Sequence, residues 1–370
     1  MPKVQLIGAT GYGGLGILEL LTAHPEFEIT GLVAREIRSG RSVSDIYPHL
    51  KGRCELPIAT IDEITVGDNA DIVVFSTPDG VSQQYAKSLN DAGIRFIDYS
   101  GDFRFKSEAD YGKYAGKHPS IRNDAHSVPE LLPQAAYGVS ELNMDSIGQA
   151  DIVGNPGCFA IGIILGLAPL FDLDIVENNL ALVDGLTGSS GAGKKPAPLQ
   201  HFSHLNDNVV PYRVMNHQHT VEAELVLGGL NGTKPATVEF IPHLLGTTRG
   251  ILNTMHVNLN RKLTRQSLLE IFDEFYSEHH FVRVLDTAPT LKDTLASNYC
   301  DISAFVSDDQ SRAVIISSID NLMKGQSGSA LQNMNVMFGY EENTGLSKLA
   351  LYLSLIHISE PTRLGMISYA

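Results

Sequence analysis

Residues 3–21 read KVQLIGATGYGGLGILELL, and this stretch decides the fold of the first half of the chain. A short run with β-branched residues, Lys3–Ile7, leads directly into a turn with four glycines, and leucines at helical spacing follow. This order is typical of a dinucleotide-binding domain, because glycines let backbone N–H groups approach a pyrophosphate at the helix N-terminus. We therefore expect cofactor contacts from the turn, namely Gly8, Thr10, Gly11, Tyr12 and Gly13.

The next segments repeat the alternation of strand and helix. Strands are predicted at Phe27–Ala34, Asp71–Thr77 and Arg95–Tyr99, and a helix is predicted at Val81–Ala92. Strands that alternate with helices form a parallel sheet, so the predicted fold class is α/β with a Rossmann-type doubly wound sheet. Such folds bind ligands at the carboxyl edge of the sheet, which makes Thr77 a further candidate for cofactor contact.

The segment after the second strand bears on which dinucleotide binds. An NAD site usually carries an acidic side chain there for the ribose hydroxyls, whereas residues 33–39 of this chain read VAREIRS. Arg35, Arg38 and Ser39 suit a 2′-phosphate, so we expect NADPH or NADP as the cofactor. Glu36 keeps NAD open as an alternative, and both arginines can also be read as solvated surface residues.

Composition limits the class of protein. The chain has 370 residues, of which 43% are hydrophobic, so it can bury a large core, and its length favours two domains. A formal net charge of −15 argues against nucleic acid or an anionic membrane as a partner. The sequence contains neither a membrane-length apolar run nor a charged-then-apolar leader, so we expect no membrane span and a cytoplasmic protein.

One of the three cysteines has an unusual setting. Their wide spacing predicts neither a disulfide framework nor a metal site and fits a reducing compartment. Cys158, however, follows a Pro-Gly turn and precedes an apolar run with helical spacing, in residues 154–168, GNPGCFAIGIILGLA. In the first turn of a helix, unpaired N–H groups and the helix dipole lower the pKa of a thiol and can hold an oxyanion. The alternative is a cysteine that acts as a small buried hydrophobe.

The second half of the chain is rich in predicted strands. They lie at residues 237–241, 251–259, 281–285, 301–306 and 313–319, with a helix at 265–279. This order suggests an α+β substrate domain with a mixed or antiparallel sheet, and we expect that sheet to carry the contacts of a homo-oligomer, a dimer or a tetramer. We expect residues 1–150 to form the dinucleotide-binding domain and residues 151–320 the catalytic and substrate domain.

Three other segments carry separate expectations. Arg104 follows a predicted strand among small polar residues, where a guanidinium can hold a phosphate or carboxylate, although a surface ion pair is the alternative. The polar segment Tyr111–Pro133 is expected to be a long loop. Residues 353–370, LSLIHISEPTRLGMISYA, look like translated vector sequence, and we expect them to be non-native.

Seven motifs in order give the chain a specific resemblance. From Lys3 to about Leu346 the sequence resembles the N-acetyl-gamma-glutamyl-phosphate reductases of arginine biosynthesis. The motifs are GATGYGG (8–14), SGDFR (100–104), GNPGCFAIGIILGLAP (154–169), GLTGSSGAGKKP (185–196), HQHTVEAE (217–224), FIPHLLGTTRGI (240–251) and KGQSGSALQNMNVMFG (324–339). One departure is Ile161, where the family pattern usually has a threonine whose hydroxyl would cap the start of the helix. The loss of this hydroxyl bears on the fine adjustment of the helix start more than on the reaction class.

The resemblance implies a reaction on a small acyl-phosphate substrate. N-acetyl-L-glutamyl 5-phosphate would be attacked by Cys158, phosphate would leave, and hydride from NADPH would reduce the thioester to the semialdehyde. Cysteine suits this chemistry because a thioester accepts hydride better than an oxygen ester and a thiolate leaves readily. By the same resemblance, Asn155 beside the cysteine is expected to contact substrate. Within residues 321–350, a helix at Gly325–Met337 is expected to return to the dinucleotide-binding domain with Gln332 or Asn333 near the cofactor; a plain packing helix is the alternative.

Two histidines supply candidates for the acid–base group. His217 and His219 precede a predicted helix at Val221–Leu230, and an imidazole titrates near neutral pH. The resemblance assigns acid–base work to His219, substrate contact to His217 and the orientation of one imidazole to Glu222. A helix cap is the alternative for one histidine, and zinc is excluded because no further ligands occur at a suitable spacing.

The glycine-rich segment at 188–194 partly matches a phosphate-binding P-loop. Lys195 stands where Ser or Thr must bind magnesium, and Pro196 blocks the helix that should follow, so a nucleotide triphosphatase is improbable. In the resembling family this segment lies near the nicotinamide. We therefore expect Gly188 and Gly191 to contact the cofactor and Ser189 and Lys194 the substrate.

Two alternatives to this function stay open. One is a sibling acyl-phosphate reductase, such as aspartate-semialdehyde dehydrogenase or the lysine-pathway aminoadipyl-phosphate reductase. The other is a non-catalytic dinucleotide-binding sensor that kept the fold. The presence of Cys158 and both histidines within their motifs favours the enzyme.

Overall fold

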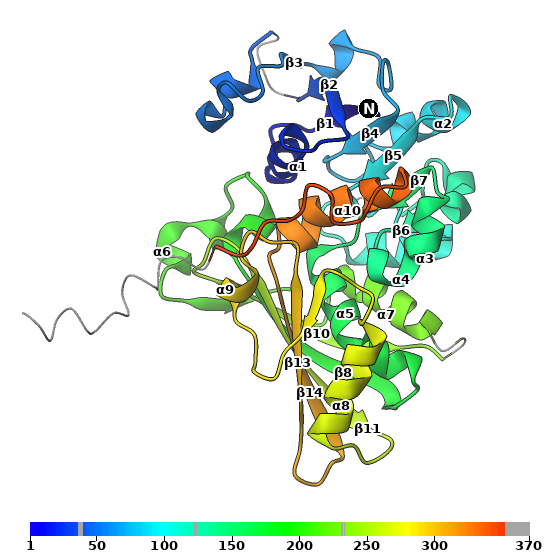
Figure 1. Cartoon of the computed structure of the whole chain (residues 1–370), viewed down its shortest axis with the longest axis vertical. Coiled ribbons are helices and arrows are strands. Elements are labelled where there is room, and N and C mark those ends of the chain that lie inside the picture. Colours follow the sequence, from blue (N-terminus) through cyan, green and yellow to red (C-terminus); the bar gives the residue numbers. More distant parts are fainter. Residues whose placement is uncertain (36–39, 122–123, 231, 233, 352–370) are drawn as a thin grey trace, which may run out of the picture.

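The chain folds around two seven-stranded sheets (Figure 1). The structure is a computed structural model, and it describes residues 1–35, 40–121, 124–230, 232 and 234–351. The first sheet, drawn in blue and cyan, lies at one end of the molecule, and the strands of the second sheet run along the other. Helix α10 (Gly328–Met337) lies between the two parts.

The first sheet is parallel throughout, with strand order β3-β2-β1-β4-β5-β7-β6. Its strands are β1 (Lys3–Ile7), β2 (Glu28–Val33), β3 (Ile58–Ala59), β4 (Ile72–Phe75), β5 (Arg95–Asp98), β6 (Ala136–Tyr137) and β7 (Ile152–Gly154). Strand β4 reads IVVF and is buried over its whole length, as expected of a central strand with helices on both faces. The predicted Rossmann-type sheet is confirmed.

Helices α1 (Tyr12–Thr22), α2 (Gln83–Asp91), α3 (Glu108–Lys117) and α4 (Ser140–Gly148) accompany this sheet. The predicted loop at Tyr111–Pro133 is therefore wrong in its first part, because α3 extends to Lys117. The Ser107 side chain caps α3 by accepting from the backbone N–H of Asp110, and Tyr111 and Tyr114 are buried. The sequence analysis missed this helix because two glycines and several polar residues mask its apolar face.

The second sheet is mixed, with strand order β12-β13-β14-β11-β8-β10-β9. Its strands are β8 (Val176–Thr187), β9 (Val209–Pro211), β10 (Thr237–Leu245), β11 (Ile251–Leu259), β12 (Val282–Val284), β13 (Cys300–Val306) and β14 (Arg312–Ile319). Strand β8 pairs in parallel with β10 and antiparallel with β11, so the expected α+β domain with a mixed sheet is confirmed. The long strand β8 was not predicted, because Asn178, Asn179 and Gly185 interrupt its apolar pattern.

Helix α5 (Cys158–Asp172) forms the core beneath this sheet. Every residue from Phe159 to Phe171 is buried, as is typical of a helix that is apolar on all sides. It packs against α7 (His219–Leu230), β11 and β14, and α8 (Arg265–Phe275) lies nearby. The α5 helix thus presents its first residue, Cys158, from a rigid support.

The chain then returns to the first sheet. A π-helical turn (Met323–Ser327) leads into α10, whose side chains Ala330, Leu331 and Met334 join the core formed by α1 and β1. The predicted helix at Gly325–Met337 is therefore split by a turn of wider pitch. Residues 353–370 lie outside the described part of the chain.

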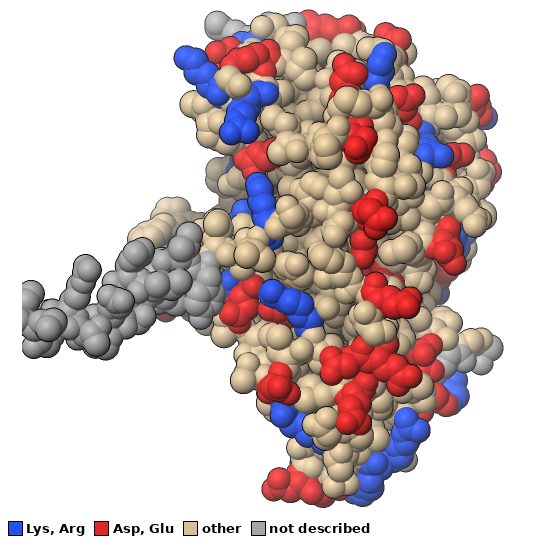
Figure 2. Space-filling view, in the orientation of Figure 1, with Lys and Arg blue, Asp and Glu red and all other residues tan. Residues whose placement is uncertain are grey.

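The surface carries the excess negative charge of the sequence. Acidic side chains are spread over the face shown in Figure 2, with lysines and arginines between them.

Smaller helical turns complete the described part, with α6 (Phe202–Leu205) and α9 (Leu291–Thr294) beside the second sheet. Within the described ranges, no helix combines the length and the hydropathy that crossing a membrane requires.

Candidate active site

A cavity of about 780 Å³ lies where the two sheets meet. It is bordered by the turn between β1 and α1, the carboxyl end of β4, the start of α5, the segment before α7 and the π turn. Predicted site residues that line it are Gly11, Tyr12, Gly13, Thr77, Arg104, Cys158, Gly191, Lys194, His217 and His219. Residues that are distant in the sequence thus meet in one space.

Cys158 is the first residue of α5 and is half-buried. Two glycines make room around it. A Cβ atom on Gly325 would lie 2.9 Å from the Cβ of Cys158, and a Cβ atom on Gly157 would lie 2.5 Å from Nε2 of His219. The nucleophile is therefore packed closely against the π turn on one side, and the residue before it is packed against an imidazole.

Burial raises the pKa of the Cys158 thiol to about 11. The Arg104 guanidinium and the backbone N–H of Phe159 act in the opposite direction but do not compensate for the lost hydration. The backbone N–H groups at the helix start lower the pKa of this thiol, as expected, but burial raises it by more. The thiol must lose its proton when substrate is bound or through a base.

His217 and His219 are buried together, with ring centroids 4.6 Å apart. The backbone N–H of His219 donates to Nδ1 of His217 over 3.2 Å, so the neutral His217 ring carries its proton on Nε2. Burial lowers the pKa of His217 to about 3 and that of His219 well below its usual value, and nearby cations add to both effects. Both rings are therefore neutral. In the described part of the chain, Nδ1 of His219 has no hydrogen-bond partner.

Glu222 makes hydrogen bonds to three groups other than the predicted imidazole. Its carboxylate accepts hydrogen bonds from Nη1 of Arg104 at 2.9 Å, from the Tyr137 hydroxyl at 2.8 Å and from the backbone N–H of Gly157 at 2.9 Å. Nε2 of His219 lies 4.0 Å from the same carboxylate, which is too far for a hydrogen bond. Glu222 thus holds the N-cap of α5 and Arg104 in place, and orients no imidazole through a hydrogen bond.

Arg104 lies at the inner edge of the cavity. Its Nε donates to the carbonyl of Asn155 at 2.7 Å and its Nη2 to the carbonyl of Tyr99 at 2.6 Å, in addition to the bond with Glu222. A guanidinium has five N–H groups, so these three bonds fix its orientation and leave donors for a ligand. Its position is compatible with the predicted contact to substrate.

A second basic group, Arg213, lies in the cavity lining and is not predicted from the sequence. Arg213 lines the cavity and donates to the Gln218 side chain and to the carbonyl of Lys117. His118, at the end of α3, also lines the cavity. Lys117 and His118 are not predicted as site residues, because the sequence pattern of this segment indicates a loop. Arg213 escaped notice because a single arginine before the HQH motif carries no signal of its own.

The glycine turn fits a dinucleotide cofactor. Gly8 has a φ of +91°, and a Cβ atom on it would lie 2.2 Å from the carbonyl oxygen of Ser76, so only glycine is accommodated. The cavity beside the turn also contains two buried polar atoms, Oγ1 of Thr77 and Oε1 of Gln326, that have no hydrogen-bond partner among the described residues. Unsatisfied buried polar atoms in a cavity indicate a polar ligand.

Several predicted site residues lie outside the cavity lining, among them Asn155, Asn333, Ser189 and Gly188. Asn155 accepts from Asn333 and donates to the carbonyl of Gln326, so these two asparagines are occupied with one another and with backbone groups. The Ser189 hydroxyl donates to the carbonyl of Thr247, and Gly188 packs against the backbone of Thr248. These four residues contact protein groups in the structure, and their contact with a ligand remains a prediction. Ser190, next in sequence, lines the cavity instead.

The remaining predictions concern the cofactor end. Nζ of Lys194 lies 3.2 Å from the Tyr47 hydroxyl, which in turn donates to the carbonyl of Thr10 over 2.7 Å. Through Tyr47, Lys194 therefore lies near the glycine turn, and its contact with substrate remains a prediction. Arg35 is exposed at the end of β2. Arg38 and Ser39 lie outside the described residues.

Comparison with known proteins identifies the family. The family model described as "Semialdehyde dehydrogenase, NAD binding domain" matches residues 3–150, and "Semialdehyde dehydrogenase, dimerisation domain" matches residues 158–321. Similar proteins named N-acetyl-gamma-glutamyl-phosphate reductase include those of Halothermothrix orenii, 39% identical over 95% of this chain and 100% of the relative, and Bacillus subtilis, 40% identical over 95% and 99%. The protein of Methanocaldococcus jannaschii is 39% identical over 95% of this chain and 99% of the relative. The chain belongs to the N-acetyl-gamma-glutamyl-phosphate reductase family.

This family membership confirms the resemblance seen in the sequence and makes the chain an oxidoreductase with an NAD(P)-binding domain. Solved structures share the fold at lower identity. Aspartate semialdehyde dehydrogenase II from Vibrio cholerae has a TM-score of 0.69 at 17% identity, covering 92% of this chain and 98% of that one. Aspartate semialdehyde dehydrogenase with NADP from Candida albicans has a TM-score of 0.68 at 16% identity, covering 93% and 99%.

Proposed function

We propose that the chain catalyses the NADPH-dependent reduction of N-acetyl-L-glutamyl 5-phosphate to N-acetyl-L-glutamate 5-semialdehyde in arginine biosynthesis. The observation that carries this function is the convergence of Cys158, His219, Arg104 and the glycine turn on one cavity, within a family whose members bear the reductase name. These four features are the parts that reduction of an acyl phosphate through a thioester requires.

In the first step, the sulfur of Cys158 attacks the acyl carbon and phosphate leaves with the bonding electron pair. The backbone N–H groups at the start of α5 are placed to stabilise the developing oxyanion. His219 accepts the thiol proton. Because burial favours the neutral thiol of Cys158 and the neutral imidazole of His219, we infer that the negative charge of the acyl phosphate raises the pKa of His219 and so couples proton transfer to substrate binding.

The nicotinamide, when bound, supplies the hydride that reduces the thioester. Thr77, Gln326 and the glycine turn are the groups proposed to hold the cofactor. Collapse of the reduced adduct breaks the C–S bond, releases the aldehyde and returns the electron pair to the Cys158 sulfur. Protonated His219 can then return its proton to the thiolate.

Recognition of the substrate is proposed to come from two basic groups. Arg104 and Arg213 both line the cavity, and both have partners that fix their side chains. One suits the phosphate and the other the α-carboxylate of an N-acetylglutamyl group, because a guanidinium binds either anion with two parallel hydrogen bonds. The preference for NADPH over NADH is proposed from Arg35 at the end of β2.

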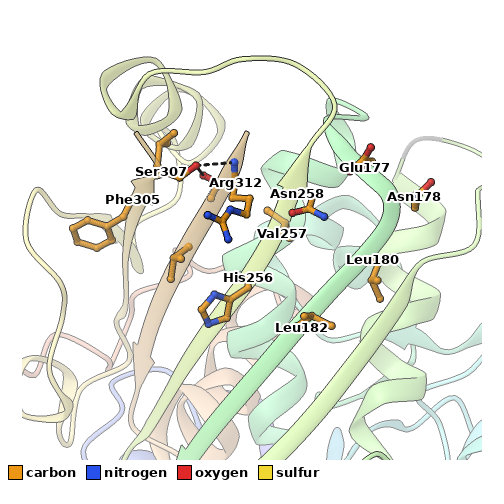
Figure 3. A pocket seen from close by; sticks show the side chains of 13 residues that line it. Glu177, Asn178, Leu180, Leu182, His256, Val257, Asn258, Phe305, Ser307 and Arg312 are labelled. Atoms are coloured by element: carbon orange, nitrogen blue, oxygen red, sulfur yellow. Dashed lines mark hydrogen bonds between the residues drawn. The ribbon is translucent and has the colours of Figure 1, made fainter. Parts of the chain in front are cut away.

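We also propose a homo-oligomer, a dimer or tetramer, whose subunits contact through the open face of the second sheet. A hollow of about 570 Å³ on this face is lined by side chains from β8, β11, β13 and β14 (Figure 3). Leu182, at the centre of the sheet, is 44% exposed. The matched dimerisation domain includes all of these strands, so a second copy of the chain is the proposed cover.

The three free thiols support a cytoplasmic location.

The reaction is tested most simply in reverse, because the acyl phosphate is labile. N-acetylglutamate semialdehyde, phosphate and NADP are mixed with the protein, and the absorbance of the reduced cofactor is followed. Activity is expected for the unaltered chain and for Cys54→Ala, and none for Cys158→Ser. Turnover of aspartate semialdehyde alone would identify a sibling reductase, and tight NADP binding without turnover of either aldehyde would identify a sensor.

A further inference from the structure

A lysine and a glutamate form an ion pair in the interior, away from the cavity. The Nζ atom of Lys324 donates to Oε1 of Glu141, and it also lies 2.8 Å from Oε1 of Gln332. The side chains of Lys324 and Glu141 are 0% and 1% exposed. Removing both charges from water is costly, and similar-sized apolar side chains often stabilise a protein as well or better. Neither residue lines the cavity, so ligand binding does not explain the pair.

The position of Lys324 in the chain supplies a reason for it. It lies in the π-helical turn Met323–Ser327, and the three residues after it make the contacts that join the two halves of the site. Gly325 packs against the Cβ of Cys158, as described above. The carbonyl of Gln326 accepts from Nδ2 of Asn155 at 3.0 Å, and the Ser327 hydroxyl donates to the carbonyl of Gly13 at 3.0 Å. The π turn thus contacts both Cys158 and the glycine turn between β1 and α1.

Glu141 holds this turn from the side of the first sheet. It lies in α4, which belongs to that part of the molecule, and its Oε1 also accepts from Nε2 of Gln332 at 3.1 Å. Gln332 in turn accepts from Nδ2 of Asn298 at 3.0 Å, a residue of the second half of the chain. The network therefore ties the π turn to both parts of the protein. Turns of this wide pitch occur frequently at functional sites.

We propose that Lys324 and Glu141 are a positioning pair that fixes the π turn and thereby sets the spacing between Cys158 and the glycine turn between β1 and α1. The proposal rests on the proposed function, because that spacing controls the geometry of hydride transfer. Each half of the site is built by its own elements, α5 for the cysteine and β1 with α1 for the cofactor turn. Loss of the ion pair should therefore displace the two halves of the site relative to each other. The cysteine should stay reactive, and the glycine turn should still bind NADP.

The first experiment compares Lys324→Met, Glu141→Gln and the double variant Lys324→Met/Glu141→Leu with the unaltered enzyme. The matched control is Lys87→Met, which removes one partner of the exposed pair Lys87–Asp91. We expect kcat to fall by about 100-fold in each Lys324 or Glu141 variant, a loss typical of a misplacement near 1 Å, with KM changed less than three-fold. The control should match the unaltered enzyme.

The double variant separates positioning from stability. Removing both charges leaves no unpaired charge in the interior, so its melting temperature should return toward that of the unaltered enzyme. Under the proposal, kcat stays low although the stability recovers. Recovery of kcat together with the melting temperature would overturn the proposal and leave a stabilising pair only.

A second measurement needs no substrate and is therefore independent of the proposed function. Iodoacetamide alkylates Cys158, and bound NADP should slow that reaction because the cofactor turn and the cysteine line one cavity. In Lys324→Met, the affinity for NADP and the alkylation rate without NADP should each stay within three-fold of the unaltered enzyme, while protection by saturating NADP falls at least five-fold. Unchanged protection, or a parallel loss of NADP affinity and thiol reactivity, would refute a positioning role.

Discussion

Gly157 shows how a single missing side chain can shape a catalytic centre. Its φ of −69° is ordinary for any residue, so the backbone does not require glycine here. The requirement is spatial, because Nε2 of His219 and Oε1 of Glu222 occupy the space that a Cβ atom would fill. The proposed base and the carboxylate that holds the helix start both depend on this gap.

Gly157→Ala should therefore damage catalysis more than folding. A Cβ atom 2.5 Å from Nε2 of His219 forces the imidazole to move, which we expect to lower kcat by about 100-fold, with an overpacking cost of roughly 1–3 kcal/mol in the free energy of unfolding. Steady-state kinetics and urea unfolding measure the two effects. Gly116→Ala is the control, because no atom lies within 4 Å of its added Cβ in α3. Equal kcat values for the two variants would contradict the expected crowding.

The ionisation of Cys158 gives a prediction about pH. Burial raises its pKa to about 11, so below that value the thiolate fraction of the ligand-free enzyme grows with pH. We expect the rate of alkylation by iodoacetamide to rise roughly ten-fold per pH unit between pH 7 and 9, since only the thiolate reacts. Mass spectrometry of the labelled peptide follows Cys158, and Cys158→Ser gives the background. A plateau below pH 8 would mean that the helix start lowers the pKa of Cys158 by more than burial raises it.

At the scale of elements, Glu222 joins two helices and a strand. It lies in the first turn of α7, yet its carboxylate accepts from the N-cap of α5 and from Tyr137 of β6. The same carboxylate neutralises Arg104, whose side chain is only 6% exposed. The position of Cys158 is thus fixed from outside its own helix.

Glu222→Gln keeps the shape of this junction and removes its charge. Arg104 would become an unpaired buried cation, so we expect a loss of about 3 kcal/mol in the free energy of unfolding. Turnover should also fall, because the start of α5 is no longer held. Chemical denaturation and kcat test this, with the exposed Glu270→Gln on α8 as the control. Full stability of the Glu222 variant would show that Arg104 finds another partner.

At the scale of the whole molecule, the second sheet has one covered and one open face. The helix α5 packs against β11 and β14 on the covered face. On the other face, side chains such as Leu182 and His256 project from central strands into the hollow of Figure 3. The hollow groups several apolar side chains, among them Leu180, Leu182 and Phe305, and contiguous exposed apolar patches mark interaction sites.

Leu182→Lys should weaken the proposed association between subunits. A charge at the centre of the sheet cannot be buried without a partner, so we expect the mass in sedimentation experiments to shift toward the monomer. Lys262→Met, on an exposed turn, is the control for a change of charge elsewhere. An unaltered mass for the Leu182 variant would place the oligomer contact on another surface.

The sequence by itself determined the architecture and the chemical type of the site. Local patterns were sufficient for the β1–turn–α1 unit, for the placement of Cys158 at the start of an apolar helix and for the family motifs. These features depend on hydrophobic periodicity and on glycine and proline within a few residues, which can be read along the chain.

Only the tertiary structure decided which of the motif residues face the cavity and how they ionise. Asn155 and Asn333 pair with one another across 178 positions in sequence, and Ser190 rather than Ser189 lines the cavity. The raised pKa of Cys158 and the lowered pKa values of both histidines come from burial by distant elements. Desolvation and side-chain orientation depend on contacts between segments far apart in the chain, and for that reason no local pattern could supply them.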